Sequence, residues 1–398
     1  MNCLIVILDG VADKPIKFRG KKVTPLEIAK KPWLDLIARE SFIGLMWPIK
    51  GLAPESDEVM LNFLDSLQFY TGRGILEAYG AGLRIEKDYT YFRCNFVKLN
   101  KRNQIIDFEP ELSKDEIKEL RVALNSEIKL NREHFWVYLL GHRSVLAIKG
   151  KALVTNTNPA YRLIKKNIRG KRVWLSEALP RPKGKLMKIK QARPLKKVRE
   201  AKLIAKAVNE FVLKSKRLID NIGIVTRGSA YELPKVNKLR GFTLFSSMPV
   251  EKAIGKLAKM KVKKMPKSVD ELIKKMQHYE NVYVQLKGPD QAAHHGDFKG
   301  KVKAIEEIDE TFFSEIYKLI KDNQINRLIV TADHTTSTKQ QAHVAAPVPL
   351  LVWEIKLKEK VKNKKRLRFD EHSAVYGFKL EGNKLYGLMK NKKISKIL

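Results

Sequence analysis

The sequence of 398 residues contains only two cysteines, Cys3 and Cys94. Both lie in segments that read as strands, so a disulfide framework and a cage of thiolate metal ligands are excluded. The chain also lacks any apolar run near the roughly 20 residues that a membrane crossing needs. Its apolar start, MNCLIVILDG, has no basic residues before it and runs into Asp9. That start predicts a strand and not a signal peptide, and we expect a cytoplasmic protein.

Acidic residues are scarce relative to basic ones: 43 against 79, a formal net charge of +36. The basic residues are densest at 181–199 and 356–368. Such segments can bind a nucleic acid or attract anionic substrates. Few aromatics interleave with them, and no nucleic-acid-binding motif is present. We therefore interpret the charge as solvated lysine-rich surface, as in heat-adapted proteins, and expect neither a nucleic-acid nor a membrane partner.

The sequence does contain short apolar runs that alternate with amphipathic stretches. LIVIL at 4–8 is typical of a strand buried on both faces. NIGIVTRG (221–228), NVYVQLKGPD (281–290) and NRLIVTADH (326–334) repeat the pattern of an apolar run before a polar turn. KVKAIEEIDETFFSEIYKLI, between the last two, has one apolar helical face. Strand, helix and strand in this order predict a mostly parallel sheet with helices on both faces, an α/β fold.

Two further segments carry specific predictions. Thr24 before Pro25 is a helix start, which predicts one helix through LEIAKKPWLDLIARE. YTYFRCNFV alternates, which places Tyr91, Arg93 and Asn95 on one face of a strand and the intervening residues on the other. HFWVYLLGHRSVLAIKG reads as two strands around a turn.

The stretch 76–215 differs in pattern from the rest of the chain. It combines these alternating strands with an amphipathic helix over 196–219. We interpret it as an inserted α+β domain that interrupts a larger α/β domain made of residues 1–75 and 216–398.

Carboxylates and imidazoles gather where the predicted parallel strands end. In open α/β sheets, ligands bind just beyond the carboxyl ends of the strands. Oxygen and nitrogen donors of this kind suit Zn²⁺, Mn²⁺ or a related divalent ion. Each of these residues alone could equally be a cap or a turn residue, but together they predict a divalent-metal hydrolase or transferase. The residues are Asp9, Asp290, His294, Asp333 and His334, with His343 close by.

Ser56, in APESDEVML, lies before a predicted helix whose backbone N–H groups could receive an anion. A hydroxyl bound to a metal loses its proton more readily, so Ser56 is a candidate nucleophile for phosphoryl transfer. Spacing alone favours a simpler interpretation, in which Ser56 is an N-cap and Asp57 and Glu58 lie in the first helical turn.

The order of several motifs resembles that of the archaeal-type, cofactor-independent phosphoglycerate mutases of the alkaline phosphatase superfamily. The motifs are VILDGVADKP, PESD, YTGRGILEAYGAGL, FRCNF, TRG, KGPDQAAHHGDFKGKV, ADHTT and HVAAPVP. The resemblance spans nearly the whole chain. It implies an alkaline phosphatase-like core with an inserted substrate-binding domain, and interconversion of 3- and 2-phosphoglycerate through a phosphoserine.

The resemblance also implies roles for single residues. It makes Ser56 the catalytic nucleophile and implies two divalent ions, whether Mn²⁺, Zn²⁺, Co²⁺ or Mg²⁺. The ligands of one ion would be Asp9, Ser56, Asp333 and His334. Those of the other would be Asp290, His294 and His343. The residues implied to bind the small phosphorylated substrate are Arg93, Arg143, Arg227 and Lys252.

The chain departs from the family pattern mainly where the family recognises its substrate. An Arg-rich element is replaced by IIDFEPELSKDE, and a DTDPH-like element by NTNPAY, with Asn156 and Asn158 in place of carboxylates. MPKSVDEL replaces a glycine-rich segment, and Ala346 replaces an aspartate. This pattern fits a diverged mutase, a metal-dependent phosphatase, or a phosphotransferase that acts on another small phosphate ester.

Overall fold

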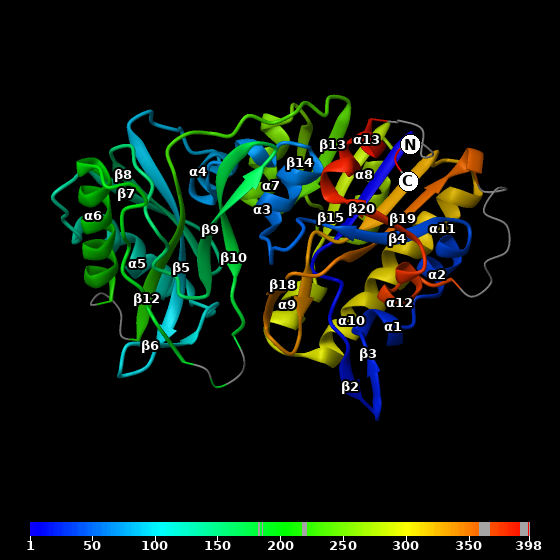
Figure 1. The fold of residues 1–398 in the computed structure, drawn as a ribbon, viewed down its shortest axis with the longest axis horizontal. Coiled ribbons are helices and arrows are strands. Elements are labelled where there is room, and N and C mark those ends of the chain that lie inside the picture. The colour runs from blue at the N-terminus through cyan, green and yellow to red at the C-terminus, as the bar shows by residue number, and fades with distance from the viewer. Residues whose placement is uncertain (182–183, 185, 217–220, 358–366, 391–396, 398) are drawn as a thin grey trace.

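The computed structural model describes residues 1–181, 184, 186–216, 221–357, 367–390 and 397. A central sheet forms one half of the molecule, on the right in Figure 1. Its hydrogen-bonded order is β14 (Lys261–Lys264), β13 (Phe242–Ser246), β15 (Asn281–Leu286), β1 (Cys3–Leu8), β16 (Arg327–Thr331), β19 (Val348–Glu354), β4 (Phe42–Trp47) and β20 (Phe378–Glu381). Of these strands, β19 runs against its neighbours and the others share one direction.

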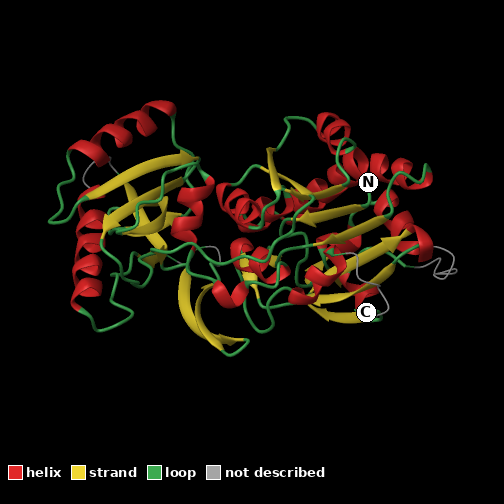
Figure 2. Cartoon of the chain, turned by 90° about the horizontal axis from the view of Figure 1, so that it is seen from above, coloured by secondary structure: helices red, strands yellow, loops and turns green. Residues whose placement is uncertain are grey.

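Two groups of helices pack around the central sheet (Figure 2). One group contains α1 (Pro25–Ile28), α2 (Pro32–Arg39), α10 (Phe298–Ile308) and α11 (Ser314–Lys321). The other contains α3 (Ser56–Phe63), α4 (Arg73–Gly80) and α7 (Pro249–Leu257). This half of the molecule also contains α8 (Val269–Met276), α9 (Pro289–His294), α12 (Glu371–Val375) and α13 (Leu385–Met389). The mostly parallel α/β class predicted from the sequence is confirmed.

A second, antiparallel sheet forms the other half of the molecule (Figure 1). It contains β11 (Met187–Lys188), β6 (Gln104–Asp107), β5 (Tyr89–Leu99), β8 (Arg143–Lys149), β7 (His134–Leu140) and β12 (Ile222–Ala230). Helices α5 (Lys114–Ser126) and α6 (Arg199–Ser215) pack against this sheet. The predicted alternation of β5 is confirmed, because Phe92, Cys94 and Phe96 pack into one apolar core with α6. Tyr91 packs instead into the core of the central sheet.

The prediction that 221–228 is a strand of the parallel sheet is wrong. β12 pairs antiparallel with β5, with Thr226 opposite Cys94. A short apolar run does not indicate which strand it will pair with. Here it pairs with the long strand β5 and not with a strand of the central sheet. The pairing extends the second sheet beyond the predicted limit at residue 215, and the domain boundaries themselves stay a prediction.

The predicted single helix after Thr24 is two helices. Thr24 caps α1 in a reciprocal capping box with Glu27, as expected of that start. Pro32 then ends the helical path, because proline lacks an N–H and disfavours helical geometry at the preceding residue. The helix predicted over 196–219 is observed as α6, over a shorter span. Residues 217–219 lie outside the described part of the chain, as does most of the basic segment 356–368.

Three hairpins complete the fold: β2 (Ile16–Phe18) with β3 (Lys21–Val23), β9 (Tyr161–Ile168) with β10 (Lys171–Ala178), and β17 (Thr335–Ser337) with β18 (Ala342–Val344).

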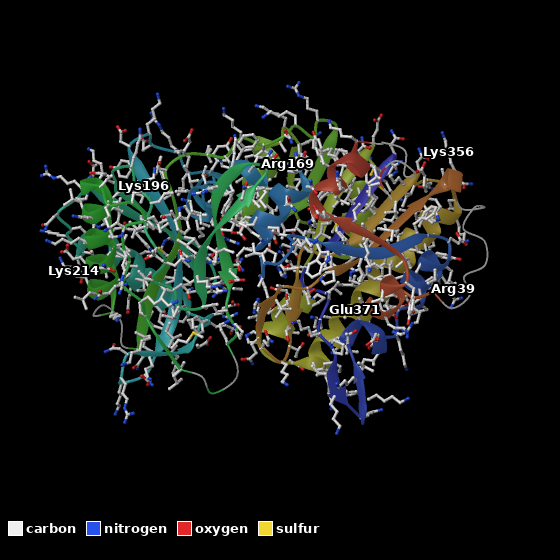
Figure 3. The ribbon with its side chains drawn as sticks, viewed as in Figure 1. Arg39, Arg169, Lys196, Lys214, Lys356 and Glu371 are labelled. Carbon is white, nitrogen blue, oxygen red and sulfur yellow. The ribbon has the colours of Figure 1, made fainter. Side chains whose placement is uncertain are left out.

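Among the residues that the structure describes, no helix has both the length and the apolar character that a membrane crossing requires. The labelled lysines lie at opposite ends of the molecule, Lys196 and Lys214 at one and Lys356 at the other (Figure 3).

Candidate active site

The site begins at the carboxyl ends of β15, β1 and β16, which are neighbours in the central sheet. Asp9 follows β1, Lys287 follows β15, and Asp333 lies two residues after β16. Since the three strands are parallel, their ends meet at one edge of the sheet. The structure therefore brings together strand-end residues that are more than 300 positions apart in the sequence.

Asp9, Asp333 and His334 form a buried group with ligand atoms within 4.8 Å of one another. His334 Nε2 lies 3.6 Å from Asp9 Oδ1 and 3.3 Å from Asp333 Oδ2. The Gly10 N–H and the Gln285 side-chain amide donate to the Asp333 carboxyl at 3.2 and 3.1 Å. These donors fix the orientation of Asp333 toward the group.

A second group contains Asp290, His334 and His343, again with ligand atoms within 4.8 Å. His343 Nε2 lies 3.7 Å from Asp290 Oδ1. His294 joins its edge, with Nε2 at 3.4 Å from Asp290 Oδ2 and 3.3 Å from His343 Nε2. Asp290 and His294 are the ends of one turn of α9, as their spacing predicted.

His334 lies at the junction of the two groups. Its Nε2 faces Asp9 and Asp333, while Thr336 Oγ1 lies 2.9 Å from its Nδ1 and donates to Asp290 at 2.7 Å. Thr336 thus links His334 to the second group through its hydroxyl. The division of the ligands between two ions stays a prediction, and this geometry is compatible with it.

Ser56 is the first residue of α3, and its Oγ lies 3.3 Å from His334 Nε2. The alternative in which Ser56 is the N-cap is wrong: the N-cap is Glu55, which forms a capping box with Glu58. The side chain of Ser56 is therefore not engaged in capping, and it faces the Asp9 group. His343 Nδ1 lies 2.7 Å from the Pro54 carbonyl, which ties the same loop to the second group.

The residues of the first group fit a divalent cation. Asp9 Oδ1 is buried and has no hydrogen-bond partner in the described part of the chain. Burial, together with the nearby Asp9 carboxylate, raises the pKa of Asp333 well above its usual range. A divalent cation between the two carboxyls would favour the charged form of both, and it would be the missing partner of Asp9 Oδ1.

His294 has two competing contacts at Nδ1. The Gln341 carbonyl lies at 3.1 Å and requires a hydrogen on Nδ1, which leaves the lone pair of Nε2 free for a ligand. The Arg181 guanidinium lies at 2.8 Å from the same nitrogen and requires a lone pair there. Only the first arrangement suits metal ligation through Nε2.

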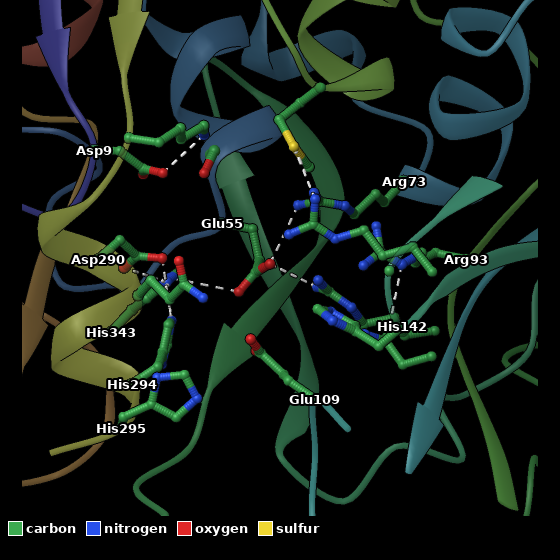
Figure 4. A pocket seen from close by; sticks show the side chains of 18 of the residues that line it. Asp9, Glu55, Arg73, Arg93, Glu109, His142, Asp290, His294, His295 and His343 are labelled. Carbon is green, nitrogen blue, oxygen red and sulfur yellow. Dashed lines mark hydrogen bonds and ion pairs between the residues drawn. The ribbon is translucent and has the colours of Figure 1, made fainter. Parts of the chain in front are cut away.

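A cavity of about 630 Å³ opens beside these groups, where the two halves of the molecule meet. Figure 4 shows Asp9, Asp290, His294 and His343 on one side, Arg73, Arg93 and His142 on the other, and Glu55 between them. Arg143 and Arg227 also line it. The arginines predicted from the resemblance thus face the candidate metal ligands across one space.

Most of these arginines are held by buried carboxylates. Arg227 lies 2.7 Å from Glu55 Oε2 and stacks 4.0 Å over the ring centre of Tyr161. Arg93 pairs with Glu77. Arg73 contacts Glu55, Asp57 and Glu77 at 3.2, 2.9 and 2.8 Å.

Arg73, whose four-residue spacing to Glu77 was the available signal, was missed by the sequence reasoning. Its ion pairs with Glu55 and Asp57 hold the residues on either side of Ser56.

Lys252 is not among the residues that line the cavity. Its neighbour on α7, Glu251, does line it and lies 3.0 Å from Lys287 Nζ. Lys287 also lies 2.7 Å from Asp9 Oδ2. Burial lowers the pKa of Lys287, but Asp9 and Glu251 outweigh it and the pKa is raised. The sequence reasoning missed Lys287, although it directly follows a predicted strand.

Three of the residues by which the chain departs from the family pattern have a defined setting in the structure. Asn156 Oδ1 accepts the N–H of Gly228, and Asn158 Oδ1 accepts the N–H of Ala160, so both asparagines brace the backbone. Glu109, in the segment that replaces the Arg-rich element, points into the cavity (Figure 4). Its pKa is lowered to about 2, because nearby His294, His142 and arginines outweigh the burial that would raise it.

The sequence profile of the metalloenzyme superfamily matches residues 1–375. A 2,3-bisphosphoglycerate-independent phosphoglycerate mutase from Aeropyrum pernix is 30% identical, over 88% of this chain and 90% of that protein. The chain belongs to this mutase family within the metalloenzyme superfamily. A mutase 1 of the same kind from Archaeoglobus fulgidus is 29% identical over 95% of this chain and 94% of that protein. The family predicted from the motifs is therefore confirmed, and its members are isomerases.

Solved structures agree on the fold of this mutase family member. A protein from Pyrococcus horikoshii has a TM-score of 0.70 at 21% identity and covers 98% of this chain and 96% of its own. A cofactor-independent phosphoglycerate mutase from Thermoplasma acidophilum has a TM-score of 0.55 at 20% identity, with 98% and 99% covered. The central sheet and the antiparallel part thus follow a known arrangement.

Proposed function

We propose that this protein interconverts 3-phosphoglycerate and 2-phosphoglycerate through a phosphoserine at Ser56. The observation that carries the proposal is the cavity in which Ser56 and the Asp9 group face Arg93, Arg143 and Arg227. A phosphoglycerate has a phosphoryl group at one position and a carboxylate at another. The side that contains Ser56 and the Asp9 group suits the phosphoryl group, and the arginines on the other side suit the carboxylate.

In the first half-reaction, Ser56 Oγ attacks phosphorus, and the bond between phosphorus and the substrate oxygen breaks. The serine hydroxyl loses its proton and the departing glycerate hydroxyl gains one. In the second half-reaction, the other hydroxyl of glycerate attacks the phosphoserine, and the Ser56 hydroxyl is restored. No phosphate leaves the cavity during the cycle, which distinguishes a mutase from a phosphatase.

Glycerate has to remain bound while it changes the hydroxyl that it presents. Arginines hold a carboxylate through two parallel N–H donors, so they can retain glycerate by one end while the other end turns. Arg143 and Arg227 come from β8 and β12 of the second sheet. The second sheet thus supplies residues that would hold the glycerate carboxylate.

We infer that two divalent ions bind at the two groups, with Asp9, Ser56, Asp333 and His334 around one. Asp290, His294 and His343 would surround the other. When bound, such ions neutralise charge on the phosphoryl oxygens and favour loss of the serine proton. Carboxylate and imidazole donors accept Mn²⁺, Zn²⁺ and Co²⁺ alike. Phosphoglycerate is a glycolytic intermediate, so we place the enzyme in the cytoplasm.

The test is an enolase-coupled assay of the purified protein with 3-phosphoglycerate and each divalent ion in turn. We expect turnover with at least one metal and none with Ser56→Ala. Inorganic phosphate is measured in the same reactions. Release of phosphate without formation of 2-phosphoglycerate would make the protein a phosphatase, and turnover by the Ser56→Ala variant would remove the proposed nucleophile.

A further inference from the structure

Lys287 lies at the end of a strand of the central sheet and lines the same cavity as Ser56. It directly follows β15, whose last residue pairs in register with Leu8 of β1. The N–H of Asp9 donates to the Leu286 carbonyl at 2.9 Å, so Asp9 and Lys287 leave the sheet side by side. Gly288, with φ of +132°, then turns the chain into α9, which carries Asp290. The lysine is thus anchored between two of the candidate ligand groups.

The ammonium of Lys287 is held by two carboxylates, Asp9 Oδ2 at 2.7 Å and Glu251 Oε1 at 3.0 Å. Glu251 is itself buried and accepts a hydrogen bond from Ser246. An ammonium has three donors in a freely rotating arrangement. Two of them serve these carboxylates, which leaves one for a ligand in the cavity that Lys287 lines together with Ser56.

The two oxygens of Asp9 face different residues. Oδ2 accepts from Lys287, while Oδ1 lies 3.6 Å from His334 Nε2 on the side of Ser56. The positive charge of Lys287 therefore lies at one oxygen of the Asp9 carboxylate, and His334 lies near the other. A fixed cation at this place can stabilise negative charge on phosphoryl oxygens without reorganising during the reaction.

Lys252, the lysine that the sequence resemblance favoured, has a different setting. It lies one position after Glu251 on α7, and consecutive helical residues point about 100° apart. Glu251 points toward Lys287 and lines the cavity, whereas Lys252 does not line it. The helix therefore supplies the carboxylate that holds the lysine and not the lysine itself.

We propose that Lys287 is a catalytic residue that binds the transferring phosphoryl group at Ser56, whereas the motif resemblance implies only that Lys252 binds the substrate. The proposal rests on the proposed function, in which Ser56 accepts the phosphoryl group. Lys287 donates a hydrogen bond to a non-bridging oxygen and remains protonated. The bond between Ser56 Oγ and phosphorus forms as the substrate bond breaks, and no proton of Lys287 is consumed.

The experiment compares Lys287→Met, Lys252→Met and Lys256→Met, the last one helical turn further along α7 as a control. Mn²⁺ binding is measured first from the rise in melting temperature, so that all proteins are compared at saturating metal. Affinity for orthovanadate, a phosphoryl analogue, and the single-turnover rate of phosphoserine formation are then determined. We expect Lys287→Met to weaken vanadate at least tenfold and to slow phosphoserine formation at least 100-fold. The other two variants should remain within threefold of wild type.

A chemical rescue experiment tests whether the positive charge of Lys287 is required, as distinct from a structural role of its side chain. Cys3 and Cys94 are fully buried, and burial raises the pKa of each thiol to about 12, so 2-bromoethylamine will react at an exposed engineered thiol. Aminoethylation of Lys287→Cys restores an ammonium at nearly the original length. We expect it to recover vanadate affinity and phosphoserine formation by at least tenfold. Where Lys287→Met does not fold, Lys287→Gln replaces it, because the amide still donates to Asp9.

Unchanged vanadate affinity in Lys287→Met, an equal loss in Lys252→Met, or the absence of rescue would overturn the proposal. Vanadate binding does not depend on isomerisation. A wild-type protein that only hydrolyses phosphate esters would therefore refute the mutase function while the vanadate comparison still tested Lys287.

Discussion

The imidazole rings of His334 and His343 lie face to face, with centroids 3.6 Å apart and planes 19° from parallel. The hairpin of β17 and β18 folds the chain back so that residues nine positions apart stack. Burial, and then the neighbouring His343, lower the pKa of His334 to about 3, and burial lowers that of His343. Two stacked neutral imidazoles keep lone pairs available, which is the state that a metal ligand requires.

Metal removal is expected to destabilise the protein. With excess EDTA, we expect the melting temperature to fall by several degrees, because the Asp9 and Asp333 carboxyls lose the cation between them. Asp333→Asn removes one of the two charges at the first group, so its melting temperature should fall less in chelator than that of wild type and, in EDTA, should be at least equal to that of wild type. Differential scanning calorimetry measures both. An unchanged wild-type melting temperature in chelator would contradict the metal site.

Gly10 keeps the space that the second ligand group needs. A Cβ there would lie 2.5 Å from Asp290 Oδ1 and 2.6 Å from Thr336 Oγ1, and φ is +57°. We expect Gly10→Ala to weaken Mn²⁺ binding at least tenfold in a fluorescence or calorimetric titration. Gly20→Ala is the matched control, because φ there is +81° with no atom within 4 Å of the added Cβ. Equal effects on Mn²⁺ binding would mean that backbone strain, and not the contact with Asp290, is responsible.

Loss of charge at Arg143 should weaken substrate binding, whereas loss of charge at Arg93 should lower stability. Within the described residues, Arg143 has no carboxylate at ion-pair distance; its guanidinium lies 2.8 Å from Met248 Sδ, and Nε has no hydrogen-bond partner. Arg143→Met should therefore raise KM for 3-phosphoglycerate by about 10–100-fold and change the free energy of unfolding by less than about 1 kcal/mol.

Arg93→Met is the comparison for Arg143. It removes a partner of the buried Glu77 and should cost about 3 kcal/mol in a urea titration. If Arg143→Met destabilised the fold as much as Arg93→Met, Arg143 would have a structural role.

Glu371 is expected to make stability depend on pH. It begins α12 (Figure 3), accepts the Asp13 N–H at 2.9 Å and the Thr24 hydroxyl at 2.6 Å, and burial raises its pKa to about 7. The folded state therefore binds a proton that the unfolded state releases between about pH 4.5 and pH 7.

The contribution of Glu371 is fully present below about pH 4.5 and is lost as pH rises through 7. Against Glu371→Gln, which does not titrate, wild type should lose up to about 3 kcal/mol of relative stability across this window. Urea titrations at pH 4.5, 6 and 7.5 measure the difference. A constant difference would contradict the raised pKa.

The sequence alone predicted the α/β class, the parallel strands and the strand-end residues. This was possible because apolar runs of strand length, and polar groups at their ends, follow from local patterning. The motif order predicted the mutase family as well. The break at Pro32 was also present in the sequence, since proline restricts its own neighbourhood regardless of tertiary contacts.

Only the tertiary structure decided which strand pairs with which. β12 resembles a parallel strand in composition but pairs with β5, because pairing depends on long-range contacts that a short run does not encode. The same limit applies to side chains. Lys252 and Lys287 are both lysines near the predicted site, and the direction of one turn of α7 places Glu251, not Lys252, at the cavity.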